Sequence, residues 1–120
     1  MSILIYEPDP LVCSDINETL SAGFPQCEID VLDVFDITKV VDKISEIGVA
    51  VLSVTQEEIQ QWMPELRNLR SWFPVVLIVD DAPRVGAFDA GLDAGLNYLP
   101  RPFSSTALLN VVSGVLSGQR

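Results

Sequence analysis

Charged side chains that follow short apolar runs are the groups with which this sequence could do chemistry. Glu7 and Asp9 follow the first such run, Asp80 and Asp81 follow a later one, and Arg101 follows the last. If these runs are parallel strands, the five side chains lie at the carboxyl edge of one sheet, where carboxylates could bind a divalent cation. We favour the alternative that they have ordinary roles. Asp9 then caps a helix, the two later aspartates are solvated, and Glu7 pairs with Arg101.

The charge balance excludes several classes of function. The chain has 17 acidic and 7 basic residues, a net charge of −10, and no histidine. Such a chain repels nucleic-acid phosphates and anionic membranes. Without imidazole it has no Ser-His-Asp triad and no histidine metal site. Cys13 and Cys27 lack metal-site spacing, so we expect reduced thiols in the cytoplasm.

Length and hydropathy predict one domain, residues 1–120, with a core of its own. Hydrophobic residues make up 48% of the chain and charged residues 20%, a balance typical of a globular protein rather than of a disordered one. No apolar run reaches the roughly 18 residues that a membrane-spanning helix needs. The first residues lack the basic flank of a signal peptide.

Apolar runs alternate with helical periodicity along the chain. We expect strands at 3–6, 29–34, 49–52, 74–79 and 96–99, with 49–52 central and 29–34 nearer an edge. We expect helices at 10–23 and 36–47, one turn at 57–61, and helices at 64–71, after Pro83 and after Ser104 or Ser105. This alternation predicts an α/β fold, a three-layer doubly wound parallel sheet of five strands.

Local signals place several helix ends. Asp9 before Pro10 is typical of an N-cap followed by proline at the first helical position. Thr55 and Glu58 have the spacing of a capping box. Pro64 predicts a helix break just before it. A set of large apolar side chains is expected to pack in the core and at a hinge, namely Trp62, Met63, Trp72 and Phe73. An interface formed by these side chains stays open as the alternative.

Three stretches resemble the receiver domain of two-component response regulators, the CheY-like family. Residues 3–10 resemble its first strand and acidic turn, and residues 74–79 its fourth strand. Residues 94–103 resemble its Ala-Gly-Ala…Tyr-Leu-x-Lys-Pro-Phe segment, slightly shortened before Tyr98. The resemblance implies the CheY-like strand order 2-1-3-4-5, which flavodoxin-like proteins share.

The positions that carry receiver chemistry are mostly changed here. In that family an aspartate ending the third strand accepts a phosphoryl group, acidic residues after the first strand hold Mg²⁺, and a Thr or Ser and a Lys bind the phosphoryl oxygens. This chain keeps the first acidic position as Glu7 but has Pro8 at the second. It has Ser53 at the acceptor, Val79 at the Thr or Ser, and Arg101 at the lysine. The resemblance therefore implies a vestigial pocket, formed by Glu7, Pro8, Asp9, Ser53, Val79 and Arg101.

We therefore expect a pseudo-receiver, a non-catalytic signalling module without cofactor or metal that acts through protein contacts. Its partner would be another protein or an output domain attached after 116–120, a stretch that resembles the start of a linker. Two alternatives stay open. One is a working receiver with atypical Mg²⁺-dependent phosphorylation. The other is a flavodoxin-like flavin binder, which is disfavoured because 7–10 has no glycine or hydroxyl to hold a phosphate.

The resemblance also implies an interaction face. It consists of the helix after Pro83, the strand 96–99 and the last helix, and we expect a homodimer through it. The expected switch and interaction residues are Tyr98, Arg101 and Pro102, with a cis bond between the last two. Tyr98 either packs inward or lies half-buried at the sheet edge. Arg101 is expected to replace metal and phosphoryl group as the counter-charge of the acidic edge.

Overall fold

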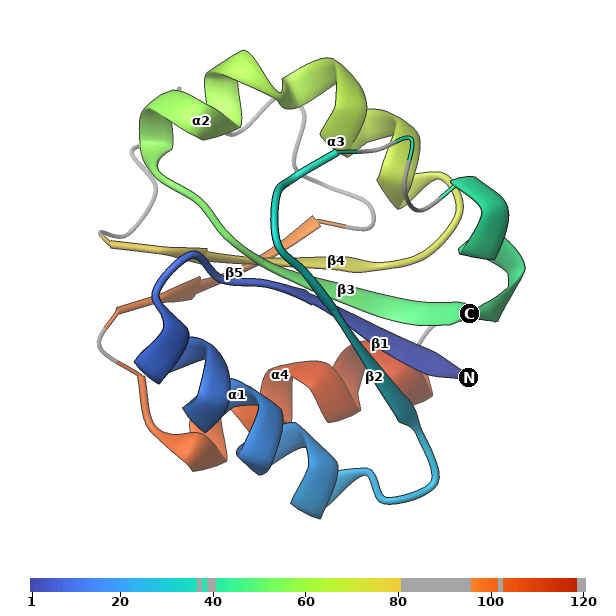
Figure 1. Ribbon diagram of the computed structural model, residues 1–120, viewed down its shortest axis with the longest axis vertical. Helices are drawn as coiled ribbons and strands as arrows, with labels where there is room; N and C mark the ends of the chain where they lie inside the picture. The colour runs from blue at the N-terminus through green and yellow to red at the C-terminus, as the bar shows by residue number, and fades with distance from the viewer. Residues whose placement is uncertain (37, 39–40, 81–95, 102, 119–120) are drawn as a thin grey trace.

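Five parallel strands form one sheet in the order β2-β1-β3-β4-β5, as the sequence predicted (Figure 1). The computed structural model describes residues 1–36, 38, 41–80, 96–101 and 103–118. The strands are β1 (Ser2–Tyr6), β2 (Glu28–Leu32), β3 (Ile47–Ser53), β4 (Val75–Val79) and β5 (Leu96–Pro100). The central position of β3 and the edge position of β2 confirm the expectations drawn from their apolarity.

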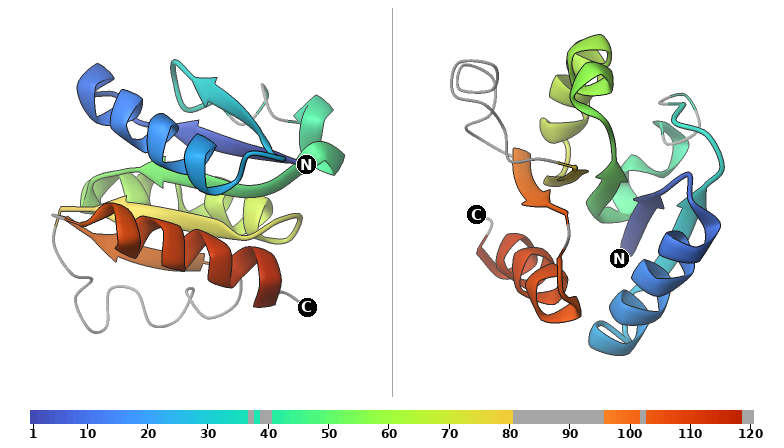
Figure 2. Two further views of the ribbon diagram at one scale, coloured as in Figure 1. Left: turned by 90° about the horizontal axis from the view of Figure 1, so that it is seen from below. Right: turned by 90° about the vertical axis from the view of Figure 1, so that its left-hand side faces the viewer.

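Helices cover both faces of the sheet, which gives the predicted three layers (Figures 1 and 2). On one face lie α1 (Pro10–Gly23) and α4 (Ser105–Gly118), and on the other α2 (Gln56–Gln61) and α3 (Met63–Arg70). A 3₁₀ helix, η2 (Val41–Glu46), leads into β3. Separate apolar clusters fill the two faces, so β3 and β4 are buried on both sides. None of the described helices is long and apolar enough to cross a lipid bilayer.

The α-helix predicted at 36–47 is wrong over residues 41–47, which the structure describes. The structure has the short η2 instead, and Ile47 belongs to β3, where it pairs with Ser2. The apolar residues whose spacing suggested one helix therefore belong to two elements: Ile44 lies in the 3₁₀ helix, and Ile47 lies at the start of β3. Ile37 and Val40 of the same spacing lie outside the described residues, as does the whole helix predicted after Pro83.

The predicted helix boundaries agree with the structure elsewhere. The Asp9 carboxylate accepts hydrogen bonds from the amides of Leu11 (2.9 Å) and Val12 (3.4 Å), so it caps α1. Thr55 and Glu58 form the predicted capping box of α2. Trp62 separates α2 from α3, as Pro64 predicted. Of the two candidate caps of α4, Ser104 accepts a hydrogen bond from the amide of Ala107 (3.0 Å).

Trp72 is the exception among the large apolar side chains expected to be covered. Phe73 is buried, and Trp62 and Met63 pack against the core cluster beneath α2 and α3. Trp72 is 48% exposed, so it does not belong to the buried core.

Candidate functional site

The residues of the expected vestigial pocket lie at the carboxyl edge of the sheet, where the strand order brings distant residues together. Glu7 follows β1, Ser53 ends β3, and Arg101 follows β5. Pairing between β1 and β3 aligns Tyr6 with Leu52, which sets Glu7 beside Ser53. The backbone amide of Arg101 donates to the carbonyl of Val79 (2.7 Å) and so holds the turn after β5 against β4.

Glu7 is the centre of this site. Its side chain is only 2% exposed. One carboxylate oxygen, Oε1, accepts from the Ser53 hydroxyl and from Nη2 of Arg101, the latter at 2.7 Å. The other oxygen, Oε2, accepts from the backbone amide of Asp9 at 3.0 Å. A buried carboxylate with one cation and two further donors is fully compensated, so its charge is tolerated in the interior.

Arg101 connects the buried carboxylate to the solvent. Its Nη1 lies 3.2 Å from Oδ1 of Asp80, a side chain that is 68% exposed, whereas Arg101 itself is 34% exposed. Solvent screens the outer pair, so the inner pair with Glu7 carries most of the electrostatic stabilisation. The predicted pairing of Glu7 with Arg101 is thus present in the structure. Asp80 joins it, and Asp81 lies outside the described residues.

The residues present do not fit the Mg²⁺ site of a receiver. Pro8 has no side-chain oxygen at the position of the second acidic ligand. Both oxygens of Glu7 already accept hydrogen bonds, and the Asp9 carboxylate caps α1. Within the part of the chain that the structure describes, no three cysteine, aspartate or glutamate side chains cluster as metal ligands would. The guanidinium of Arg101 supplies the positive charge beside Glu7 instead.

Ser53 and Val79 stand at the positions that the resemblance assigns to the aspartate acceptor and to the phosphoryl-binding hydroxyl. Ser53 is 3% exposed and donates its hydroxyl to Glu7, so a kinase could reach it only if the sheet edge opened. Val79 is fully buried and offers only methyl groups. At the end of β3 the site therefore holds a hydroxyl bonded to the Glu7–Arg101 ion pair.

Tyr98 lies on the other side of β5 from the α1 and α4 layer. Its ring packs, partly buried, against the cluster beneath α2 and α3. Burial raises the pKa of the Tyr98 phenol well above its ordinary value. Of the other switch residues that the sequence suggested, Arg101 belongs to the Glu7 site. Pro102, and with it the predicted cis bond, lies outside the described residues.

An aromatic cluster beside the pocket was not anticipated from the sequence. The rings of Phe35 and Trp62 stack with centroids 4.4 Å apart, and Tyr6 lies 6.0 and 6.3 Å from them. Burial raises the pKa of Tyr6, and the carboxylates of Glu58 and Glu7 raise it further. The three rings come from β1, the segment after β2 and the α2–α3 junction, so no local spacing could have revealed them.

Comparison with known proteins identifies the architecture. No protein-family model and no curated protein sequence matches the chain at a significant level. Solved structures, in contrast, do match the chain. A CheY-like response regulator from Mesorhizobium loti superposes with a TM-score of 0.73 at 19% identity, covering 93% of this chain and 95% of that one. An orphan response regulator of H. pylori gives 0.70 at 19% identity, covering 97% and 96%.

The fold is that of a CheY-like receiver domain. The receiver fold also occurs in the pilus assembly protein CpaE from Caulobacter crescentus, with a TM-score of 0.66 at 12% identity over 94% of this chain and 97% of that one. A shared receiver fold does not by itself decide function, which depends on the side chains at the site. Here the carboxyl edge of the receiver fold carries the Glu7–Ser53–Arg101 arrangement.

Proposed function

We propose that this chain is a non-catalytic pseudo-receiver domain of a two-component or phosphorelay response regulator. In this proposal it signals through protein contacts and does not become phosphorylated on aspartate. The observation that carries the proposal is the bonding of Ser53. At the position that the resemblance assigns to the phosphoacceptor, a buried hydroxyl donates to Glu7, and Glu7 is paired with Arg101.

The chemistry of these groups supports a role without phosphoryl transfer. An acyl phosphate needs a carboxylate nucleophile at the end of β3, and the residues from 49 to 55 include no Asp or Glu. A serine hydroxyl would form a phosphate ester and not the acyl phosphate of a receiver, and the Ser53 hydroxyl is buried and bonded to Glu7. The cation that would neutralise an incoming phosphoryl group is already bound to Glu7 at 2.7 Å.

The proposal also covers where and with what the domain works. The net charge of −10 disfavours nucleic acid and anionic membranes as ligands of this domain. A protein partner or an attached output domain, in the cytoplasm, is the natural recipient of a signal transmitted by contact. No cofactor and no catalytic activity are required for such a role.

Intact-protein mass spectrometry after incubation with acetyl phosphate and Mg²⁺ tests the proposal. We expect the wild-type mass to stay unchanged. The matched positive control is the combined variant Pro8→Asp, Ser53→Asp, Val79→Thr, Arg101→Lys, which restores every receiver group and should gain the mass of one phosphate. A gain in the wild type that is lost on acid or hydroxylamine treatment would support the alternative, a working receiver with atypical chemistry.

The flavodoxin-like alternative is separated by a different measurement. A flavin binder would show visible absorbance after incubation with flavin mononucleotide and gel filtration. We expect none, because Glu7, Pro8, Asp9 and Pro10 provide negative charge and no phosphate-binding glycine turn.

A further inference from the structure

The strand β2 lies at an edge of the sheet, and among the described residues it pairs with β1 alone. Its five residues follow a regular parallel register, from Ser2 opposite Glu28 to Tyr6 opposite Leu32, without a bulge or a proline. Figure 1 shows β2 in front of the other strands. An edge strand of this kind is a place at which an extended chain can add a further strand.

The register shows which backbone groups of β2 are available to such a strand. The amide of Glu28 donates to the carbonyl of Met1 (3.1 Å), so Glu28 directs its backbone groups toward β1. Successive residues of a strand direct their N–H and C=O groups to opposite sides. Asp30 therefore also faces β1, whereas Ile29 and Val31 direct their N–H and C=O groups away from the sheet.

A groove of about 450 Å³ lies beside this edge, between β2 and α1. Val31 lines it from the strand, and Cys13, Ser14 and Asn17 line it from the helix. Ile29 packs in the core cluster on the α1 side of the sheet, and Val31, two residues further along, faces the same side. Val31 is nevertheless 44% exposed. An apolar side chain of an added strand, placed beside Val31, would enter this groove and cover the valine.

The other face of β2 is acidic. Glu28 and Asp30 alternate with Ile29 and Val31, so their side chains lie on the face away from α1. Lys43 lies 3.9 Å from Asp30, but both side chains are partly exposed, so solvent screens this pair. The segment 28–46 has six acidic residues and two lysines, namely Glu28, Asp30, Asp33, Asp36, Asp42 and Glu46 against Lys39 and Lys43. An added strand would therefore meet negative charge on this face.

We propose that β2 accepts an extended segment of a partner protein as a further strand, in which basic residues alternate with apolar ones. The basic side chains lie beside Glu28 and Asp30, and an apolar one enters the groove at Val31. A second copy of this chain is disfavoured as the occupant. Two antiparallel β2 strands with Ile29 opposite Val31 would place Asp30 directly opposite Asp30 of the other copy, and like charges in that position are destabilising. Strand addition involves no phosphoryl chemistry, so the inference goes beyond the proposed function.

Fluorescence anisotropy with a labelled peptide of five Lys-Val repeats tests the proposal. This peptide alternates basic and apolar residues as the added strand requires, and a peptide of five Glu-Val repeats is its matched acidic control. We expect only the basic peptide to bind, with an affinity that falls as salt screens the charges. Hydrogen exchange at the amides of Ile29 and Val31, measured by nuclear magnetic resonance, should slow on binding because both amides then bond to the added strand.

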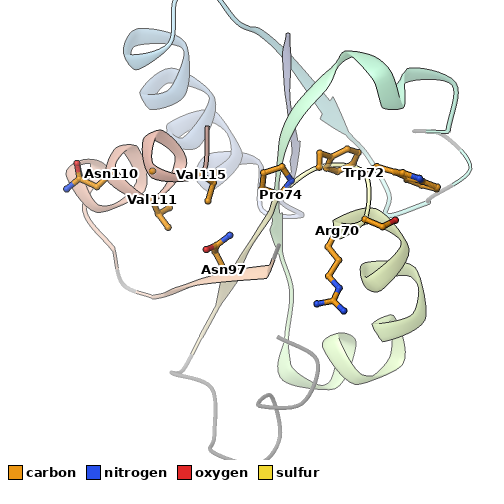
Figure 3. Close-up of a pocket in the computed structure, with 10 residues that line it drawn as sticks. Arg70, Trp72, Pro74, Asn97, Asn110, Val111 and Val115 are labelled. Carbon is orange, nitrogen blue, oxygen red and sulfur yellow. The ribbon is translucent and has the colours of Figure 1, made fainter. Parts of the chain in front are cut away.

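Variants of the chain separate strand addition from general attraction between charges. Val31→Pro removes an outward donor and no bond to β1, so it should weaken binding about tenfold. Asp30→Lys should weaken binding to a similar extent. Glu18→Lys makes the same change of net charge at an exposed position of α1 and should have a much smaller effect. Trp72→Ala, in the separate groove beside β5 that Figure 3 shows, should leave binding unchanged.

Three results would overturn the proposal. The basic peptide could bind no more tightly than the acidic one, its binding could leave exchange at Ile29 and Val31 unchanged, or Asp30→Lys and Glu18→Lys could weaken binding equally. Slow exchange at these two amides in concentrated protein without peptide would indicate a second copy and would likewise contradict it.

Thermal unfolding of each variant verifies that lost binding is not lost fold. If Val31→Pro does not fold, Asp30→Lys, at a partly exposed position, still tests the proposal. If Val31→Pro folds and binds as tightly as the wild type, strand addition is wrong. The acetyl phosphate experiment needs no peptide, so this inference and the proposed function can fail separately.

Discussion

Replacing Arg101 by methionine should destabilise the domain markedly. The substitution keeps much of the aliphatic stem but leaves Glu7, 2% exposed, without the guanidinium 2.7 Å away. Removing one partner of a buried ion pair costs about 3–5 kcal/mol. Because Arg101 is 34% exposed, water can solvate part of the site, and we expect about 2–3 kcal/mol. For a domain of this size that corresponds to a fall in Tm of about 8–12 °C.

Urea denaturation followed by far-ultraviolet circular dichroism measures this loss. Arg67→Met is the matched control, because Arg67 is exposed on α3 and should change the free energy of unfolding by less than about 0.5 kcal/mol. In a Glu7→Gln variant the buried charge is absent. There, Arg101→Met should lower the free energy of unfolding by at least about 1 kcal/mol less than it does in the wild type. Equal effects of Arg101→Met and Arg67→Met would refute the idea that Arg101 compensates a buried charge.

Two further changes test other parts of the structure. Because burial raises the pKa of Tyr98, the phenol ionises more readily in the unfolded chain, and stability should fall as pH rises above about 10. Tyr98→Phe should flatten that fall in urea midpoints measured from neutral to alkaline pH, and an unchanged slope would contradict the burial argument. Gly114→Ala should stabilise α4 by about 0.5–1 kcal/mol, whereas Gly23→Ala should destabilise by about 1–3 kcal/mol because Leu109 must move. Thermal unfolding that shifts in the same direction for both glycine variants would disprove this reasoning.

The fold was predictable because its signals are local and agree with one another. Asp9, Thr55 and Pro64 mark helix boundaries by chemistry that acts within one turn, and all three are found where the sequence predicted. The apolar run of β3 required a central position, which the sheet order confirms. The helix predicted at 36–47 failed because Ile47 fits the helical spacing from Ile44 and also begins the apolar strand β3, and periodicity alone could not decide between them.

The candidate site was predictable only in part. The pairing of Glu7 with Arg101 followed from their positions after parallel strands, which meet at one edge. The hydrogen bond from Ser53 to Glu7 could not be predicted, since it depends on side-chain rotamers across β1 and β3. The exposure of Trp72 was also missed, because a large aromatic residue beside a helix end is usually covered, as the neighbouring Phe73 is.

Thermal unfolding in the presence and absence of millimolar Mg²⁺ tests most directly whether Arg101 has taken the place of a metal ion beside Glu7. A ligand that binds only the folded state raises the free energy of unfolding by RT ln(1 + [L]/Kd), where [L] is the concentration of free ligand. We predict the same Tm for the wild type with Mg²⁺ and with a chelator, while a Pro8→Asp, Arg101→Ala variant should gain stability from Mg²⁺. A clear Mg²⁺-dependent rise in the Tm of the wild type would contradict the account.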